Sequence, residues 1–196
     1  IDIGGGTTDI LYVNPTTKEA NVYSAFFAAN DLWNDGLDRV ASSYKANGFL
    51  KYYTTLCCKN LGDKKNDLDK VIVTSSSSAD VINYLFTNDF WSRFSSEIKA
   101  SREMMQLPII HFSALCFYTA YVLHMGEVEI PKVVSFTGMG SKYISLINQS
   151  KDSIAQIINA IFKKAGEIFD NPDLKNANVS VEFPPNPKEI TAEGAL

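Results

Sequence analysis

Three consecutive glycines and two threonines near the start of the chain could bind an anion. Two short β-type segments, 1–3 and 9–13, flank the sequence Gly4-Gly5-Gly6-Thr7-Thr8. Because glycine has no Cβ, backbone N–H groups can converge on a phosphate there, and the threonine hydroxyls add donors. Asp2 precedes the turn and can hold Mg²⁺ through water molecules. The pattern predicts a phosphate-binding β-hairpin; the alternative is a tight hairpin whose glycines serve only the turn geometry.

A second glycine-containing segment follows a predicted strand at 132–137. Its sequence is Gly138-Met139-Gly140-Ser141, and a predicted helix containing Ile144 comes after it. Such a junction brings the backbone close to a ligand at the positive end of a helix. The same pattern is also typical of plain helix–sheet packing.

The remaining chain predicts a β-meander followed by alternating strands and helices. Periodicity and turn residues give a third strand at 19–27, an insertion at 49–105, helices at 109–125 and 154–169, and a strand at 179–183. Asp152 or Ser153 is the expected cap of the helix at 154–169. A meander followed by strand–helix alternation implies an α/β fold, a mixed sheet covered by helices.

Composition limits the classes of function. The chain has 196 residues, 45% of them hydrophobic, and a net charge of −4, so we expect a packed core and no nucleic-acid partner. The three cysteines fit reduced thiols in a cytoplasmic protein. No signal peptide and no membrane span are expected, and the apolar segment 107–125 is interpreted as a buried helix. Because the chain starts without methionine in a strand-like run, we expect an upstream segment.

Several other polar residues are interpreted as structural. His111 and His124 are too far apart on their predicted helix to form a metal pair at one-turn spacing, so they are expected as core or helix-end histidines. Cys116 is expected to pack in the core. Asp9 is expected to hydrogen-bond the hairpin turn rather than to take part in chemistry.

Three segments together resemble one superfamily. The sequence Asp-Ile-Gly-Gly-Gly-Thr-Thr-Asp at 2–9 resembles the second phosphate motif of the actin, DnaK-type chaperone and sugar-kinase ATPases. Residues 133–141 resemble the adenosine motif of that superfamily, and residues 186–195 resemble the last helix of its chaperone branch. The three segments occur in the family's order and span nearly the whole chain.

The resemblance implies an RNase-H-like second lobe, a mixed sheet flanked by helices. Residues 1–48 and 106–196 would form the nucleotide-binding subdomain, and 49–105 an inserted smaller subdomain. The hairpin residues Gly4, Gly5, Gly6, Thr7 and Thr8 would bind the β- and γ-phosphates of ATP. Asp2 would be the catalytic-site residue that helps to place Mg²⁺. The adenosine would lie along Gly138, Met139, Gly140 and Ser141, although Met139 stands where the family often has glycine.

The expected function is therefore the ATP-binding lobe of a bacterial actin-like or DnaK-like ATPase in the cytoplasm. Its first partner would be a missing first lobe, which carries the other phosphate motif, so this piece alone is expected to be inactive. Two alternatives stay open: a non-catalytic scaffold built on a degenerate ATPase fold, and a lobe of a sugar or metabolite kinase. Self-assembly and protein clients are open as further partners.

Overall fold

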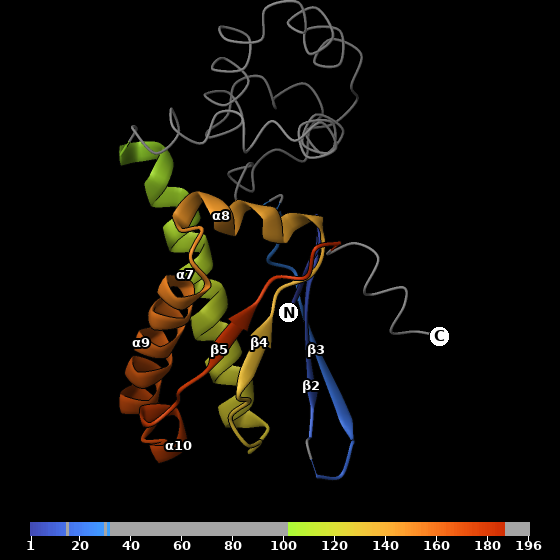
Figure 1. The fold of residues 1–196 in the computed structure, drawn as a ribbon. Coiled ribbons are helices and arrows are strands. Elements are labelled where there is room, and N and C mark those ends of the chain that lie inside the picture. The colour runs from blue at the N-terminus through green and yellow to red at the C-terminus, as the bar shows by residue number, and fades with distance from the viewer. Residues whose placement is uncertain (15, 30, 32–101, 187–196) are drawn as a thin grey trace, which may run out of the picture. The chain divides into compact units, whose positions relative to one another are not determined.

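The described part of the chain has a mixed α/β structure (Figure 1). The computed structural model describes residues 1–14, 16–29, 31 and 102–186. The elements in these ranges are β1 (Asp2–Ile3), β2 (Thr8–Val13), β3 (Ala20–Ala25), α7 (Arg102–Met125), β4 (Val133–Ser135), the 3₁₀ helix η3 (Met139–Tyr143), α8 (Ile144–Ile147), α9 (Lys151–Phe169), α10 (Pro172–Lys175) and β5 (Ser180–Glu182). The predicted α/β class is confirmed for these residues.

The chain divides into two compact units. One combines Ile1–Ala28 with Pro108–Leu196, and the other is Ala29–Leu107. Both glycine segments belong to the first unit. Residues 49–101 of the predicted insertion and 187–195 of the terminal motif lie outside the described residues. The predicted subdomain boundaries therefore stay a prediction.

The predicted meander is confirmed as an antiparallel sheet of β1, β2 and β3. Its register places Thr8 opposite Ile3 on one side and opposite Ala25 on the other. Along β2 the side chains of Ile10 and Tyr12 are buried, and the residues between and after them are partly or fully exposed. This alternation follows from the two-residue period of a strand that packs one face on the core.

Backbone hydrogen bonds join this sheet to a second, parallel one made of β4 and β5. The amide of Ile3 donates to the carbonyl of Thr137 (2.9 Å), and the amide of Thr137 donates to the carbonyl of Ile1 (2.8 Å). Asp2 and Thr137 thus form a parallel bridge. The strands consequently follow the spatial order β3-β2-β1-β4-β5, with β1, β4 and β5 parallel (Figure 1).

The long helices α7 and α9 each contribute a row of buried apolar side chains to the core. The rings of Phe112 on α7 and Phe136 after β4 lie 5.7 Å apart, and both side chains are buried. Asn159 on α9 fixes the entry of β5, since its amide donates to the carbonyl of Val179 and accepts from the amide of the same residue (3.0 and 2.8 Å). The face of α9 toward the core consists of Ile154, Ile158, Phe162 and Ala165.

Helix α9 begins earlier than the sequence predicts. It starts at Lys151, and the Ser150 hydroxyl caps it by accepting a hydrogen bond from the amide of Ser153 (3.3 Å). The expected caps, Asp152 and Ser153, lie in its first turn, so that prediction is wrong. The apolar period begins at Ile154, and a period of this kind does not mark the polar turn that precedes it.

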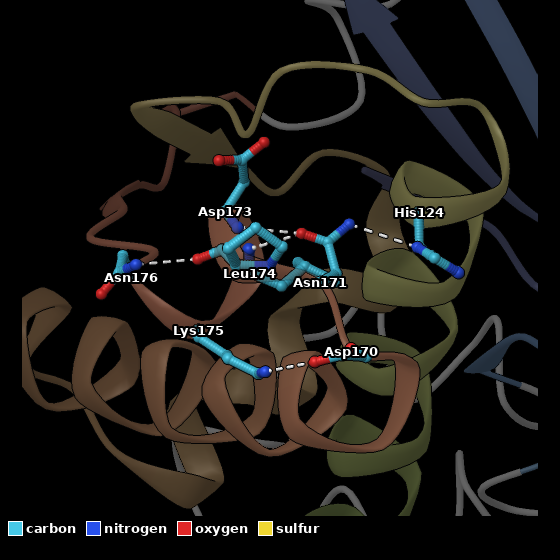
Figure 2. Close-up of polar contacts among 8 residues, drawn as sticks. His124, Asp170, Asn171, Asp173, Leu174, Lys175 and Asn176 are labelled. Atoms are coloured by element: carbon cyan, nitrogen blue, oxygen red, sulfur yellow. Dashed lines mark hydrogen bonds and ion pairs between the residues drawn. The ribbon is translucent and has the colours of Figure 1, made fainter.

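The short helix α10 follows α9 through a polar corner (Figure 2). Asp170 takes a left-handed conformation (φ 52°) and ends α9. The Asn171 side-chain oxygen then accepts hydrogen bonds from the amides of Asp173 and Leu174, both at 3.0 Å, and its NH₂ group donates to Nδ1 of His124 (3.2 Å). His124 lies in the last turn of α7, which confirms its interpretation as a helix-end histidine.

One helix among the described residues is long and apolar enough, by length and composition alone, to cross a membrane. The window Pro108–Met125 of α7 has 18 residues and a mean hydropathy of 1.2, and half of it is buried inside the structure. A membrane-length apolar window is therefore present where none was expected from the sequence. Core helices of soluble proteins pass the same test.

Candidate functional site

The first half of the candidate site is the glycine turn, residues 4–7, between β1 and β2. The amide of Gly4 donates to the carbonyl of Thr7 (2.9 Å) and closes the turn. Gly5, Gly6 and Thr7 are exposed. A Cβ added to Gly6 would meet no atom within 4 Å, and among the described glycines a left-handed φ occurs at Gly138 alone. Neither crowding nor backbone strain within the described fold thus explains the glycine at position 6.

The two residues after the turn are held by the protein itself. Thr8 is fully buried, and its hydroxyl donates to the carbonyl of Phe27 (2.7 Å). Asp9 accepts a hydrogen bond from the hydroxyl of Ser24, its partner on β3, so the expected bond to the hairpin turn is replaced by a cross-strand one. Antiparallel register brings these two side chains to the same face of the sheet. The local sequence around Asp9 does not indicate this pairing.

The second half is the Gly138 loop, residues 138–141, which continues from β4 into η3. Gly138 has φ 77° and ψ 153°, and a Cβ there would overlap the Asp2 carboxylate and the Ile3 carbonyl. Both the backbone conformation and the close approach therefore require glycine. The loop is tightened by Ser141, whose hydroxyl and amide both donate to the carbonyl of Gly138 (2.8 and 3.1 Å). Within the loop, Gly138, Gly140 and Ser141 are buried and Met139 is half-buried.

These two glycine segments, distant in the sequence, meet at one edge of the sheet. The glycine turn follows β1 and the Gly138 loop follows β4, and these two strands are parallel neighbours through the Asp2–Thr137 bridge. Asp2 lies at the junction, with its carboxylate against Gly138. Ligands of open sheets bind beyond the carboxyl ends of parallel strands, which is the position of both segments. The structure thus brings the sequence-predicted residues into one neighbourhood.

A buried polar cluster lies within the same unit and was not anticipated as a cluster. Nε2 of His111 lies 2.9 Å from the carbonyl of Ala28, and its Nδ1 lies 2.8 Å from the Tyr143 hydroxyl. Phe27 stacks on the imidazole at 4.3 Å between centroids. The expectation of His111 as a core histidine is confirmed. Its partner Tyr143, at the end of η3, carries no local sequence signal because the two residues are 32 positions apart.

Two buried groups in this region ionise less readily than usual. Burial raises the pKa of Tyr143 well above its ordinary value of 10.0. Burial also raises the pKa of the Cys116 thiol, which confirms its expected place in the core. Both groups are therefore neutral at physiological pH, and the thiol lacks the thiolate character that a nucleophile needs.

The described residues contain no group of three or more His, Cys, Asp or Glu side chains arranged to hold a metal ion. Mg²⁺ sites near phosphates use one or two carboxylates together with water and ligand oxygens, and Asp2 is the carboxylate that lies against Gly138. Comparisons with protein-family models, with curated proteins and with solved structures find no match to this chain.

Proposed function

We propose that this chain is the ATP-binding lobe of an actin-like or DnaK-type ATPase. In this proposal the glycine turn binds the β- and γ-phosphates of Mg-ATP, and the Gly138 loop lies along the adenosine. A first lobe would bind the nucleotide from the other side, and the protein would act in the cytoplasm. The observation that carries the proposal is that both glycine segments meet at the carboxyl ends of two parallel strands.

The strand order supports the finer description of the fold as an RNase-H-like lobe. The order β3-β2-β1-β4-β5 continues an antiparallel meander into parallel strands, which agrees with the mixed sheet proposed for such a lobe. Helix α7 connects toward β4, and α9 connects β4 to β5, as expected for parallel strands joined by crossover helices.

The predicted binding residues fall into an exposed group and a group whose hydroxyls are already hydrogen-bonded within the chain. Gly5, Gly6 and Thr7 are open to a ligand, whereas Thr8 and Ser141 use their hydroxyls for bonds within the chain. We assign the first three to the phosphates and the last two to shaping the backbone around them. Backbone N–H groups at a glycine turn bind phosphate oxygens without any side-chain obstruction.

Asp2 has the position of a magnesium-placing residue. It lies two residues before Gly4, the first residue of the glycine turn, and its carboxylate lies against Gly138. A bound Mg²⁺ would supply positive charge that neutralises the charge developing in phosphoryl transfer. The role of the carboxylate is to orient the cation through its water molecules rather than to act as a base.

Calorimetry of the full-length protein with ATP tests this function. We expect binding heat that depends on Mg²⁺, is abolished by EDTA and is strongly reduced in Asp2→Asn. The matched control is Asp152→Asn, which removes an exposed carboxylate from the first turn of α9 and should bind like the wild type. Absence of Mg²⁺-dependent heat in the wild type would overturn the proposal and favour a non-catalytic scaffold.

The need for a first lobe is tested separately. The chain 1–196 alone should turn over ATP negligibly, because one lobe can hold only one side of the nucleotide and positioning dominates phosphoryl transfer. Robust turnover by this chain, abolished by Asp2→Ala, would contradict the requirement for a second lobe. Transfer of phosphate to a small acceptor by the full-length protein would instead place it among the kinases.

A further inference from the structure

We propose that a chain of contacts from Thr8 through His111 to Tyr143 fixes the glycine turn relative to the Gly138 loop. It consists of the Thr8–Phe27 hydrogen bond, the backbone that joins Phe27 to Ala28, and the buried hydrogen bonds of His111 to Ala28 and Tyr143. His111 and Tyr143 are then positioning residues of the candidate site. This inference rests on the proposed function for its consequence on nucleotide binding. The mechanical coupling itself can be measured without any nucleotide.

The chain begins at the residue that follows the glycine turn. Thr8 is fully buried, and the sheet holds its backbone between Ile3 and Ala25. Its hydroxyl donates to the carbonyl of Phe27 at 2.7 Å, which ties the end of the turn to the segment after β3. A shift of the turn would therefore have to move this segment or break the hydrogen bond.

The middle of the chain is an imidazole with a single suitable tautomer. The Ala28 carbonyl can only accept, so Nε2 of His111, 2.9 Å away, must carry the hydrogen. Nδ1 lies 2.8 Å from the Tyr143 hydroxyl, and in a neutral ring with the hydrogen on Nε2 it accepts the hydroxyl hydrogen. The Phe27 ring stacks on the imidazole at an interplanar angle of 20° and restricts its rotation.

The chain ends on the last residue of η3. Tyr143 is fully buried, and its ring meets the His111 imidazole nearly edge-on, at 88° and 5.1 Å. Burial raises the pKa of Tyr143, which keeps its hydroxyl protonated and able to donate. Among the described residues, the Tyr143 hydroxyl makes one hydrogen bond, to Nδ1 of His111.

A direct contact joins the other end of η3 to the same site. Gly138 caps η3 and packs on Asp2 and on the Ile3 backbone, so the loop touches β1 there. The direct contact and the chain of contacts together form a closed path through both halves of the site. A buried polar group that loses its hydrogen-bond partner is costly in free energy. This closed path of contacts therefore favours one position of the glycine turn relative to the Gly138 loop.

Amide hydrogen exchange of the full-length protein without nucleotide tests the coupling. Tyr143→Phe keeps the ring and removes the hydroxyl. We expect the hydrogen-bonded amides in residues 4–8 and 138–141, among them those of Gly4 and Ser141, to exchange at least ten-fold faster. Tyr12→Phe is the matched control, because the buried Tyr12 hydroxyl makes no hydrogen bond among the described residues. Amides of α9 serve as an internal reference and should keep their wild-type rates in both variants.

Two results of this experiment would overturn the inference. One is unchanged exchange of residues 4–8 in Tyr143→Phe. The other is faster exchange in α9 to the same extent as in the site, which would mean a general loss of stability. Both outcomes are readable whether or not the protein binds ATP, so failure of the coupling is distinguishable from failure of the proposed function.

Affinity measurements test the consequence for the nucleotide. Tyr143→Phe and Thr8→Val should each weaken Mg-ATP binding at least five-fold. The double variant should bind little more weakly than the single variant with the lower affinity, because both substitutions break the same chain of contacts. His111→Gln offers one donor and one acceptor and should bind better than His111→Leu. Wild-type affinity in both Tyr143→Phe and His111→Leu would show that these residues only pack the core.

Discussion

Alanine substitutions at Gly138 and Gly6 should separate a glycine that the fold requires from one that it does not. At Gly138 the backbone is left-handed (φ 77°), and an added Cβ would overlap the Asp2 carboxylate and the Ile3 carbonyl. At Gly6 the backbone is not left-handed, and no atom lies within 4 Å of the added Cβ. The two changes are chemically identical and lie in the two halves of one site.

The expected loss of stability differs several-fold. A non-glycine residue in a sparsely populated backbone region costs roughly 1–3 kcal/mol. Overpacking of an occupied site adds roughly 1–3 kcal/mol. Gly138→Ala should therefore lower the free energy of unfolding by about 2–6 kcal/mol. Gly6→Ala should change it by less than about 1 kcal/mol, toward greater stability, because alanine reduces the entropy of the unfolded chain.

Urea denaturation followed by circular dichroism measures both free energies, and calorimetry then measures Mg-ATP binding by the folded variants. For Gly6→Ala we expect wild-type stability with at least ten-fold weaker Mg-ATP binding, since a methyl group on the open turn obstructs phosphate approach. Equal destabilisation by the two substitutions would refute the steric reasoning. Wild-type affinity in a well-folded Gly6→Ala would refute the assignment of the glycine turn to the phosphates.

Two further predictions concern the fold around the site. Asn171→Ala removes the cap of α10 and should lower the free energy of unfolding by roughly 1–2 kcal/mol; Asn171→Asp, which keeps the accepting oxygen, should lose less in the same urea titration. Burial raises the pKa of Tyr143 and of Cys116 above their ordinary values of 10.0 and 9.0, so the unfolded chain ionises first. Stability should be constant below about pH 8 and should fall as the pH rises further, because the unfolded state then binds fewer protons than the native one. Urea titrations from pH 7 to 11 check this, and a Cys116→Ala, Tyr143→Phe variant that declines as steeply as the wild type would contradict the assignment.

The strands and long helices were predictable because their patterns repeat within a few residues. The alternation of Ile10 and Tyr12 with exposed neighbours has the period of a strand, and the spacing of Ile154, Ile158 and Phe162 has the period of a helix. The ends of the elements depend on single polar contacts instead. Ser150 was missed as the cap of α9 for this reason, and the four-residue helix α10 is too short to show any period.

The close approach at Gly138 could not be predicted, because it depends on a partner strand. The sequence indicated that glycines occur at two places, and it gave no sign that Gly138 packs directly on Asp2. Only the parallel bridge between Asp2 and Thr137 creates that contact. The same holds for His111 and Tyr143, whose pairing arises from the packing of α7 against η3 and from no local pattern.

The hydroxyls of the two glycine segments show that a sequence motif alone does not identify which of its groups contact a ligand. Thr8 and Ser141 were both candidates to bind the nucleotide, and in the structure both hydroxyls donate to backbone carbonyls of the chain. A donor committed in this way fixes a backbone shape, and that shape decides which amides stay open. Thr7 carries the matching hydroxyl on an exposed position. If the phosphate assignment is correct, Thr7→Val should weaken Mg-ATP binding with little change in amide exchange, whereas Thr8→Val should change both.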